Sequence, residues 1–127
     1  MAAILLVDDH RPLRELLAEA MVGAGHVVTQ AGDGNEAIRR LGERPFDAVV
    51  CDMLMPEADG AEVLAVLRRQ QPRPRLVVIS GGGSIPPENY LRMARVLGAE
   101  EVLQKPFPPS RLIDLLARLL APSARPQ

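Results

Sequence analysis

Short apolar runs alternate with amphipathic stretches along the whole chain. The apolar runs are rich in Val, Ile and Leu and predict strands over residues 3–8, 26–31, 46–52, 75–80 and 101–104. Most of them lack the in–out alternation of a half-exposed strand, which is typical of parallel strands covered on both faces. The pattern therefore predicts a parallel sheet between two layers of helices.

The amphipathic stretches carry apolar residues at helical spacing and predict a helix after each strand. They centre on residues 13–24, 37–41, 63–67, 91–97 and 112–120. Pro12 suits the first turn of the first helix, Gly25 its end, and Ser110 the N-cap position of the last helix. Five strands and five helices in strict alternation predict an α/β fold with a doubly wound sheet in the order 2-1-3-4-5.

The chain has 127 residues, which is enough for one domain with a single core. A formal net charge of −1 argues against binding to nucleic-acid phosphates or anionic lipid, and two Phe, one Tyr and no Trp offer no base-stacking platform. The single cysteine, Cys51, excludes an internal disulfide and a multi-cysteine zinc site. The apolar run at the start is too short for a signal peptide or a membrane span. We therefore expect a cytoplasmic protein that binds neither nucleic acid nor membrane.

Polar residues end four of the five predicted strands. The first ends in Asp8 and Asp9, and the others in Asp52, Ser80 and Lys105. We expect these side chains to lie together, because the carboxyl ends of the strands form the binding crevice of an open α/β sheet. Three carboxylates at close range repel one another, so either one pKa rises or a cation lies between them. Oxygen ligands without His or Cys favour a hard ion such as Mg²⁺.

The same residues fit phosphoryl transfer. Asp52 can act as a nucleophile that forms an aspartyl phosphate, while the metal and Lys105 neutralise the phosphoryl oxygens and Ser80 donates a hydrogen bond to one of them. Lys105 is the only lysine among fifteen basic residues, and its compact ammonium fits a crowded phosphoryl site better than a guanidinium does. The alternatives are a chance lysine in an arginine-rich chain, a serine that merely begins a loop, and a solvated pair of acids.

Four segments in this order and spacing resemble a known family. They are Leu5-Leu6-Val7-Asp8-Asp9, Ala31-Gly32-Asp33-Gly34-Asn35-Glu36-Ala37, Asp52-Met53-Leu54-Met55-Pro56 with Gly60, and Lys105-Pro106-Phe107. The chain resembles the receiver domain of two-component response regulators, in the stand-alone chemotaxis-type form, over about residues 3–120. The resemblance implies a flavodoxin-like receiver domain over residues 1–121. The residues after the fifth predicted helix, 122–127, are few and include two prolines, so we expect a short flexible tail and no output domain.

The resemblance also implies a phosphoryl donor, which is a histidine kinase or a histidine phosphotransfer protein. The signal would pass on through contact with a downstream protein or through onward transfer in a phosphorelay. Such a protein is a switch that catalyses its own phosphorylation, with weak autophosphatase activity at most, rather than an enzyme. In the implied site, Asp52 is the acceptor. Mg²⁺ is held by Asp9, Asp52 and the Leu54 carbonyl, and through water by Asp8. Ser80 provides the switch hydroxyl, and Lys105 binds the phosphoryl group and precedes a cis peptide bond to Pro106.

The chain departs from the family pattern at several positions. Val102 stands three residues before the lysine, where family members often have an aromatic residue that swings inward on activation. We therefore expect the relay from the Ser80 hydroxyl to such a ring to be weakened or replaced. Gly81 follows Ser80 where Ala is usual, in a loop that is longer than the common pattern. The positions that tune attack of water on the acyl phosphate are Leu54 and Gly82. Neither can hydrogen-bond that water, which predicts slow hydrolysis.

Other functions remain open at the level of sequence. One alternative is a phosphohydrolase with an aspartate nucleophile, but such an enzyme has a second acid two residues after the nucleophile, where this chain has Leu54. Another is a flavin-binding module, but Asp8-Asp9-His10 after the first strand would repel the flavin phosphate without a metal. A receiver that binds partners without phosphate turnover is a third alternative. We interpret Cys51 as a buried structural thiol and His10 as a solvent-exposed side chain.

The fifth helix allows two interpretations. Leu115 widens its apolar arc beyond what a narrow core-facing stripe requires. Either the helix packs deeply into the core, or this edge forms a docking or homodimer face together with the fourth helix. The arc also includes Leu112, Ile113, Leu116, Leu119 and Leu120.

Overall fold

The structure is a computed structural model and describes residues 2–52, 59–81, 92, 95–96 and 98–121. Within these residues, five strands form one parallel sheet in the order β2-β1-β3-β4-β5, which confirms the predicted topology. The strands are β1 (Ala3–Val7), β2 (Val27–Ala31), β3 (Ala48–Asp52), β4 (Arg75–Ser80) and β5 (Glu101–Gln104). The described helices are α1 (Arg11–Gly23), α2 (Gly34–Glu43), α3 (Asp59–Arg68) and α5 (Pro109–Leu120).

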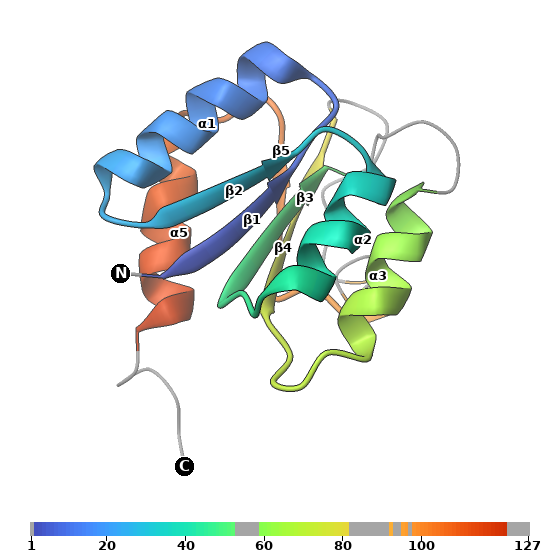
Figure 1. Ribbon diagram of the computed structural model, residues 1–127. Helices are drawn as coiled ribbons and strands as arrows, with labels where there is room; N and C mark the ends of the chain where they lie inside the picture. The colour runs from blue at the N-terminus through green and yellow to red at the C-terminus, as the bar shows by residue number, and fades with distance from the viewer. Residues whose placement is uncertain (1, 53–58, 82–91, 93–94, 97, 122–127) are drawn as a thin grey trace.

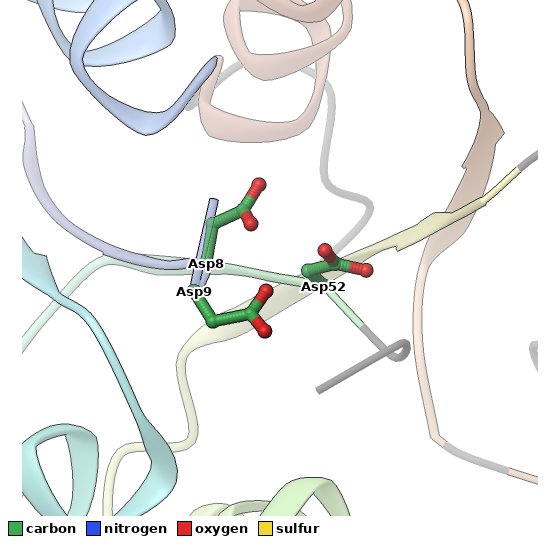
Figure 2. Close-up of side chains that lie close together, drawn as sticks. All are labelled: Asp8, Asp9 and Asp52. Atoms are coloured by element: carbon green, nitrogen blue, oxygen red, sulfur yellow. The ribbon is translucent and has the colours of Figure 1, made fainter. Parts of the chain in front are cut away.

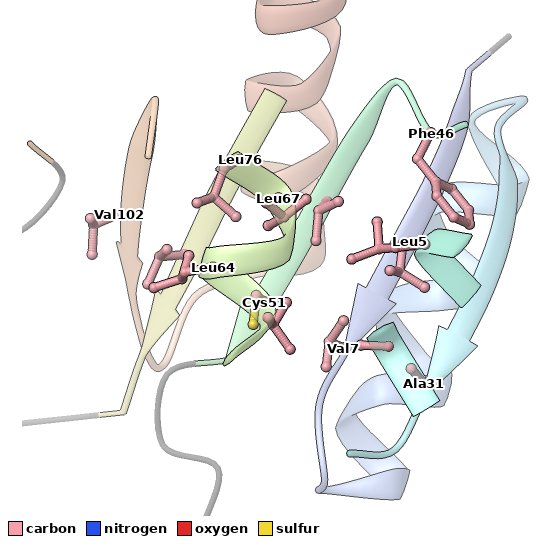
Figure 3. Close-up of a cluster of buried hydrophobic side chains, with 14 residues drawn as sticks. Leu5, Val7, Ala31, Phe46, Cys51, Leu64, Leu67, Leu76 and Val102 are labelled. Carbon is pink, nitrogen blue, oxygen red and sulfur yellow. The ribbon is translucent and has the colours of Figure 1, made fainter. Parts of the chain in front are cut away.

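Helices cover both faces of the sheet, with α1 and α5 on one face and α2 and α3 on the other (Figure 1). Successive residues of β1 point to opposite faces: Ile4 and Leu6 pack under α1 and α5, whereas Leu5 and Val7 pack under α2 and α3. All four are fully buried, which explains why β1 is an unbroken apolar run in the sequence. Figure 3 shows the cluster under α2 and α3, to which β5 also contributes.

The fifth predicted helix differs from the prediction at its start. It begins at Pro109, with Pro108 as N-cap and no side-chain capping bond, so the assignment of Ser110 as N-cap was wrong. The reason is local, because Pro109 lacks an N–H and already has the backbone angle of a first helical residue. The helix therefore begins one residue before Ser110. Arg111 N closes this first turn on Pro108 O at 2.9 Å.

The same helix settles the question about Leu115. Its side chain is only 5% exposed and packs in the cluster between the sheet, α1 and α5. The interpretation of Leu115 as part of an exposed docking edge was therefore wrong, and this residue belongs to the core. A homodimer face formed by the fourth and fifth helices stays a prediction.

Several predicted features lie partly or wholly outside the described residues. Of the fourth helix, the structure describes helical backbone at Arg92, Arg95 and Val96, and Gly98 follows with a positive φ of 75°. The predicted tail over residues 122–127 lies outside them, as do Leu54 and Gly82. Among the helices that the structure does describe, none is both long and apolar enough to span a bilayer.

Candidate metal and phosphoryl-acceptor site

Parallel pairing brings the ends of β1 and β3 together at one edge of the sheet. Asp8 directly follows β1, and Asp52 is the last residue of β3. Figure 2 shows Asp8 and Asp9 together, across from Asp52. Each of the three side chains offers one oxygen, and these oxygens all lie within 4.8 Å of one another. The predicted convergence of the three carboxylates is confirmed.

Lys105 reaches the same site from the other side. It follows β5, and its Nζ lies 3.1 Å from Asp52 Oδ2 and 3.9 Å from Asp8 Oδ2. The ammonium therefore points toward the acids, as the sequence predicts. The Lys105–Pro106 peptide bond is cis, as the family resemblance implies. At the end of β4, Ser80 is only 2% exposed, and its carbonyl accepts a hydrogen bond of 2.9 Å from Lys105 N.

The environment of Asp8 is unusual for an acid. The residue is fully buried, and burial raises the pKa of its carboxyl group. The nearby Asp52 charge raises this pKa further, while the hydrogen bond from His10 N to Asp8 Oδ1, 2.9 Å long, and the Lys105 charge lower it. Because the pKa of Asp8 is raised in spite of these two interactions, the fold compensates the ionised carboxylate only in part.

These features fit a bound Mg²⁺ ion. The donor set consists of carboxylate oxygens, which are the ligands that this ion prefers. Asp8 Oδ2 is buried and has no hydrogen-bond partner among the described residues, and its ion pair with Lys105 Nζ is 3.9 Å long, so a metal ion would add a close partner for this oxygen. Asp9 is exposed, whereas Asp8 and Asp52 are buried, so the site opens to solvent on the side of Asp9.

Cys51 and His10 behave as the sequence predicts. Cys51 is buried, and its pKa is raised to about 12, first by burial and then by the charges of Asp52 and Asp8. A thiol with so high a pKa is no nucleophile at neutral pH. His10 is exposed at the start of α1.

Arg14 also contacts this site, although its position in the sequence does not indicate such a contact. Its Nη1 donates a hydrogen bond of 2.8 Å to the carbonyl oxygen of Asp8. In the sequence, Arg14 is a polar residue on an amphipathic helix and is indistinguishable from a solvated one. The only local signal is its place one turn into the helix that follows the paired acids.

A family model for the response regulator receiver domain matches residues 4–117. The chain belongs to this family. Receiver domains are signalling domains of two-component systems rather than classical enzymes. They interact with histidine kinases or phosphotransfer proteins and with downstream targets, and they bind Mg²⁺ in an acidic pocket.

Individual relatives agree with this assignment. The receiver domain is 37% identical over 123 residues to the transcriptional regulatory protein TcrA of Mycobacterium tuberculosis, which covers 96% of this chain and 46% of TcrA. It is 32% identical over 117 residues to the response regulator protein FleR of Pseudomonas aeruginosa, which covers 92% of this chain and 24% of FleR. The solved structure of the chemotaxis response regulator CheY4 of Vibrio cholerae has a TM-score of 0.81 and 30% identity, and covers 94% of this chain and 99% of that one.

The chain thus spans less than half of the curated relatives TcrA and FleR. Because TcrA is a transcriptional regulatory protein, the expectation that this receiver domain does not bind nucleic acid stays a prediction. The same holds for the expectation that it acts without an output domain.

Proposed function

We propose that this receiver domain accepts a phosphoryl group on Asp52 from a histidine kinase or a histidine phosphotransfer protein. The reaction depends on Mg²⁺, and the signal then passes on through protein contact or onward phosphotransfer. The observation that carries this proposal is that Asp52 lies close both to two further acids and to an ammonium group. On one side, Asp8 and Asp9 complete an acidic group whose oxygens lie within 4.8 Å of one another, and on the other the Lys105 ammonium lies 3.1 Å from Asp52 Oδ2.

The transfer is a substitution at phosphorus. A carboxylate oxygen of Asp52 attacks, the N–P bond of the donor phosphohistidine breaks, and the imidazole leaves with the electron pair and takes up a proton. The new O–P bond makes an acyl phosphate on Asp52. Little covalent chemistry is left for the other residues, so their contribution is positioning and neutralisation of charge.

Each neighbouring residue has a role in that positioning. Asp8, Asp9 and Asp52 would hold Mg²⁺, which neutralises charge on the phosphoryl oxygens when it is bound. Lys105 already spans Asp52 and Asp8 and is placed to turn toward the incoming phosphoryl group. Ser80 ends the strand next to β5, and its hydroxyl is proposed to donate to a phosphoryl oxygen. The further ligand, the Leu54 carbonyl, is proposed on the resemblance alone.

Acetyl phosphate provides the direct test, because it is a small donor that needs no partner protein. With Mg²⁺, the intact mass of the chain should increase by one phosphoryl group, and with a chelator it should not. Asp52→Asn should abolish the increase, because the amide is not a nucleophile. Phosphorylation of Asp52→Asn would contradict the choice of acceptor. No mass increase in the wild type with Mg²⁺ would favour a receiver that only binds its partners.

A further inference from the structure

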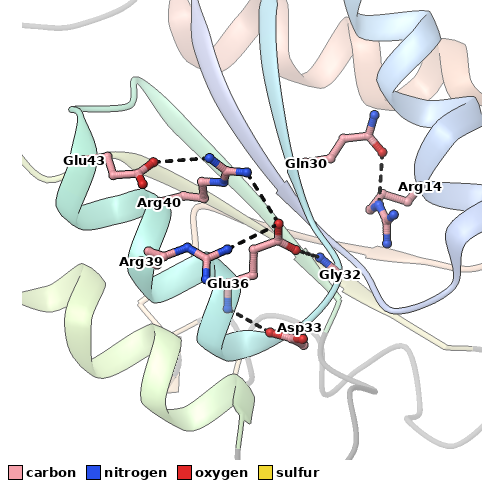
Figure 4. A network of polar contacts seen from close by, with 8 residues as sticks. All are labelled: Arg14, Gln30, Gly32, Asp33, Glu36, Arg39, Arg40 and Glu43. Carbon is pink, nitrogen blue, oxygen red and sulfur yellow. Dashed lines mark hydrogen bonds and ion pairs between the residues drawn. The ribbon is translucent and has the colours of Figure 1, made fainter.

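Arg14 connects the end of β1 to the neighbouring strand β2. Its Nη1 donates to the carbonyl oxygen of Asp8 at 2.8 Å, and its Nε donates to Gln30 Oε1 at 3.0 Å. Gln30 belongs to β2 and pairs in register with Leu6, close to the end of β1. Figure 4 shows the bond between Arg14 and Gln30 beside the polar contacts at the start of α2. The two bonds use different nitrogens of one planar group, so the guanidinium has a defined orientation.

The carbonyl that Arg14 contacts determines where Asp9 lies. The C=O of Asp8 and the N–H of Asp9 belong to one planar peptide unit, so holding the carbonyl also holds the point from which the Asp9 side chain starts. Asp8 has anchors of its own, because its N–H donates to Ala31 O at 3.1 Å and its Oδ1 accepts from His10 N. The Asp9 carboxylate is exposed, and no hydrogen bond to another described residue restrains it. Its position therefore depends on the backbone.

Arg14 also lies close to the turn that follows β2. A Cβ at Gly32 would lie 3.1 Å from Arg14 Nη1, so the turn after β2 comes close to the guanidinium. That turn is itself held, because Gly32 N donates to Glu36 Oε1 at 2.8 Å (Figure 4). The half-buried Arg14 is thus close to two pieces of backbone that have hydrogen bonds of their own. The orientation of the guanidinium therefore limits the orientation of the Asp8 carbonyl that it contacts.

We propose that Arg14 is a positioning residue for the metal site, in that its guanidinium orients the Asp8–Asp9 peptide and so holds the Asp9 carboxylate ready for Mg²⁺. This inference rests on the Mg²⁺ site of the proposed function. A simple charge effect has the opposite sign, because a guanidinium near the site repels a divalent cation. Loss of the positioning contact weakens Mg²⁺ binding, whereas loss of the charge alone strengthens it.

The test is calorimetric titration of Mg²⁺ into the wild type, Arg14→Met and the control Arg11→Met. Arg11 lies on the same helix, but its guanidinium pairs with Glu15 at 3.2 Å and its side chain is 77% exposed, so both variants lose one positive charge from α1. Arg14→Met should weaken Mg²⁺ binding roughly tenfold, at the lower end of the range for groups that orient metal ligands. Arg11→Met should leave it unchanged or slightly tighter.

A kinetic measurement separates positioning from general damage to the site. In Arg14→Met, the Mg²⁺ concentration for half-maximal phosphorylation by acetyl phosphate should rise by the same factor as the dissociation constant. The rate at saturating Mg²⁺ should stay within about twofold of the wild-type rate, since the reacting groups are untouched. Thermal unfolding without Mg²⁺ checks that each variant is folded.

Gln30→Met is the second variant and covers the case in which Arg14→Met does not fold. It leaves the charge of Arg14 in place and removes only the acceptor for Nε, so it should also weaken Mg²⁺ binding, by a smaller factor. If the wild type binds Mg²⁺ and the folded Arg14 and Gln30 variants bind it equally well or more tightly, the inference is wrong and the proposed function stands. If the wild type does not bind Mg²⁺, the proposed function is wrong and the inference with it.

Discussion

Among single residues, Asp8 best shows the conflict between folding and function in this receiver domain. The fold buries its carboxylate completely and places a second acid, Asp52, beside it. Both burial and the like charge raise the pKa of Asp8, and Asp8 Oδ2 has no hydrogen-bond partner among the described residues. The Lys105 ammonium, 3.9 Å from Asp8 Oδ2, offsets only part of this cost, so the ionised carboxylate destabilises the native state until a second cation compensates it. We therefore expect the site to bind its ion at the expense of stability.

Replacing this acid should stabilise the metal-free protein. Asp8→Asn removes one buried charge and keeps an oxygen for the bond from His10 N. We expect the free energy of unfolding in chelator at neutral pH to increase by about 1–3 kcal/mol, because the amide carries no charge that must be buried beside Asp52. Urea denaturation measures this difference.

The same variant should lose the response to Mg²⁺. A ligand that binds only the folded state raises stability by about 2.7 kcal/mol at a hundred times its dissociation constant. The wild type should show a Mg²⁺-dependent increase of this kind, and Asp8→Asn a much smaller one. A variant that is less stable than the wild type in chelator would contradict the argument from buried charge.

Among the elements, α5 shows why a sequence pattern alone does not decide which helix face is buried. Its apolar arc is broad, and both a deep position in the core and a partly exposed docking edge agree with it. Packing against the sheet and α1 places Leu115 in the core, while Leu119 and Leu120 remain only partly buried at the end of the helix. The prediction for α5 therefore concerns stability and not partner binding.

Two leucine-to-alanine variants test this assignment. Leu115→Ala should lower the free energy of unfolding by about 2–5 kcal/mol, because it leaves a cavity in the core. The matched variant Leu16→Ala, on α1 at a side chain that is 52% exposed, should change it by no more than about 0.5 kcal/mol. Urea denaturation of both variants provides the comparison. Equal effects of the two substitutions would show that Leu115 is not a core residue.

At the scale of the molecule, one edge of the sheet carries the whole candidate site. The acids come from the ends of β1 and β3, the hydroxyl from β4 and the amine from the residue after β5. Asp52 ends β3, which pairs with β4, the strand that ends at Ser80. Lys105 follows β5, one strand further on, and reaches Asp52 through its side chain. Val102 in β5 is buried in the core, where family members often have an aromatic switch residue. A signal that leaves this site is therefore expected to use contacts other than a rotating ring.

The duration of the signal follows from the lifetime of the acyl phosphate. The family resemblance assigns Leu54 and Gly82 to the two positions that tune attack of water, and neither side chain has a group that hydrogen-bonds a water molecule. We expect the phosphorylated protein in Mg²⁺ buffer to persist for minutes or longer after the donor is removed, as followed by intact mass. Leu54→Asn, which restores a polar group, should shorten this time. A wild-type lifetime of only seconds would contradict the prediction.

Much of this molecule was predictable from local pattern. The unbroken apolar runs of β1, β3 and β4 arise because these central strands are buried on both faces, and together with the helical stretches between them they indicated the strands and the fold class. The position of the acids and Lys105 at the ends of those runs was enough to predict their convergence, because all parallel strands end at the same edge. The role of the Ser80 hydroxyl stays a prediction. The start of α5 was not predicted correctly, because Pro108 and Pro109 prevailed over the capping preference of Ser110.

Other features depended on how the elements pack against one another. The burial of Asp8 beside an exposed Asp9, the deep position of Leu115 and the contact of Arg14 with the Asp8 carbonyl all follow from how the helices and strand ends sit against their neighbours. Hydrophobic periodicity records which face of an element is apolar, but not how far the element is rotated or how closely another segment approaches it. The type and place of the reactive groups were therefore local information, whereas their solvation and support arose only when distant segments met.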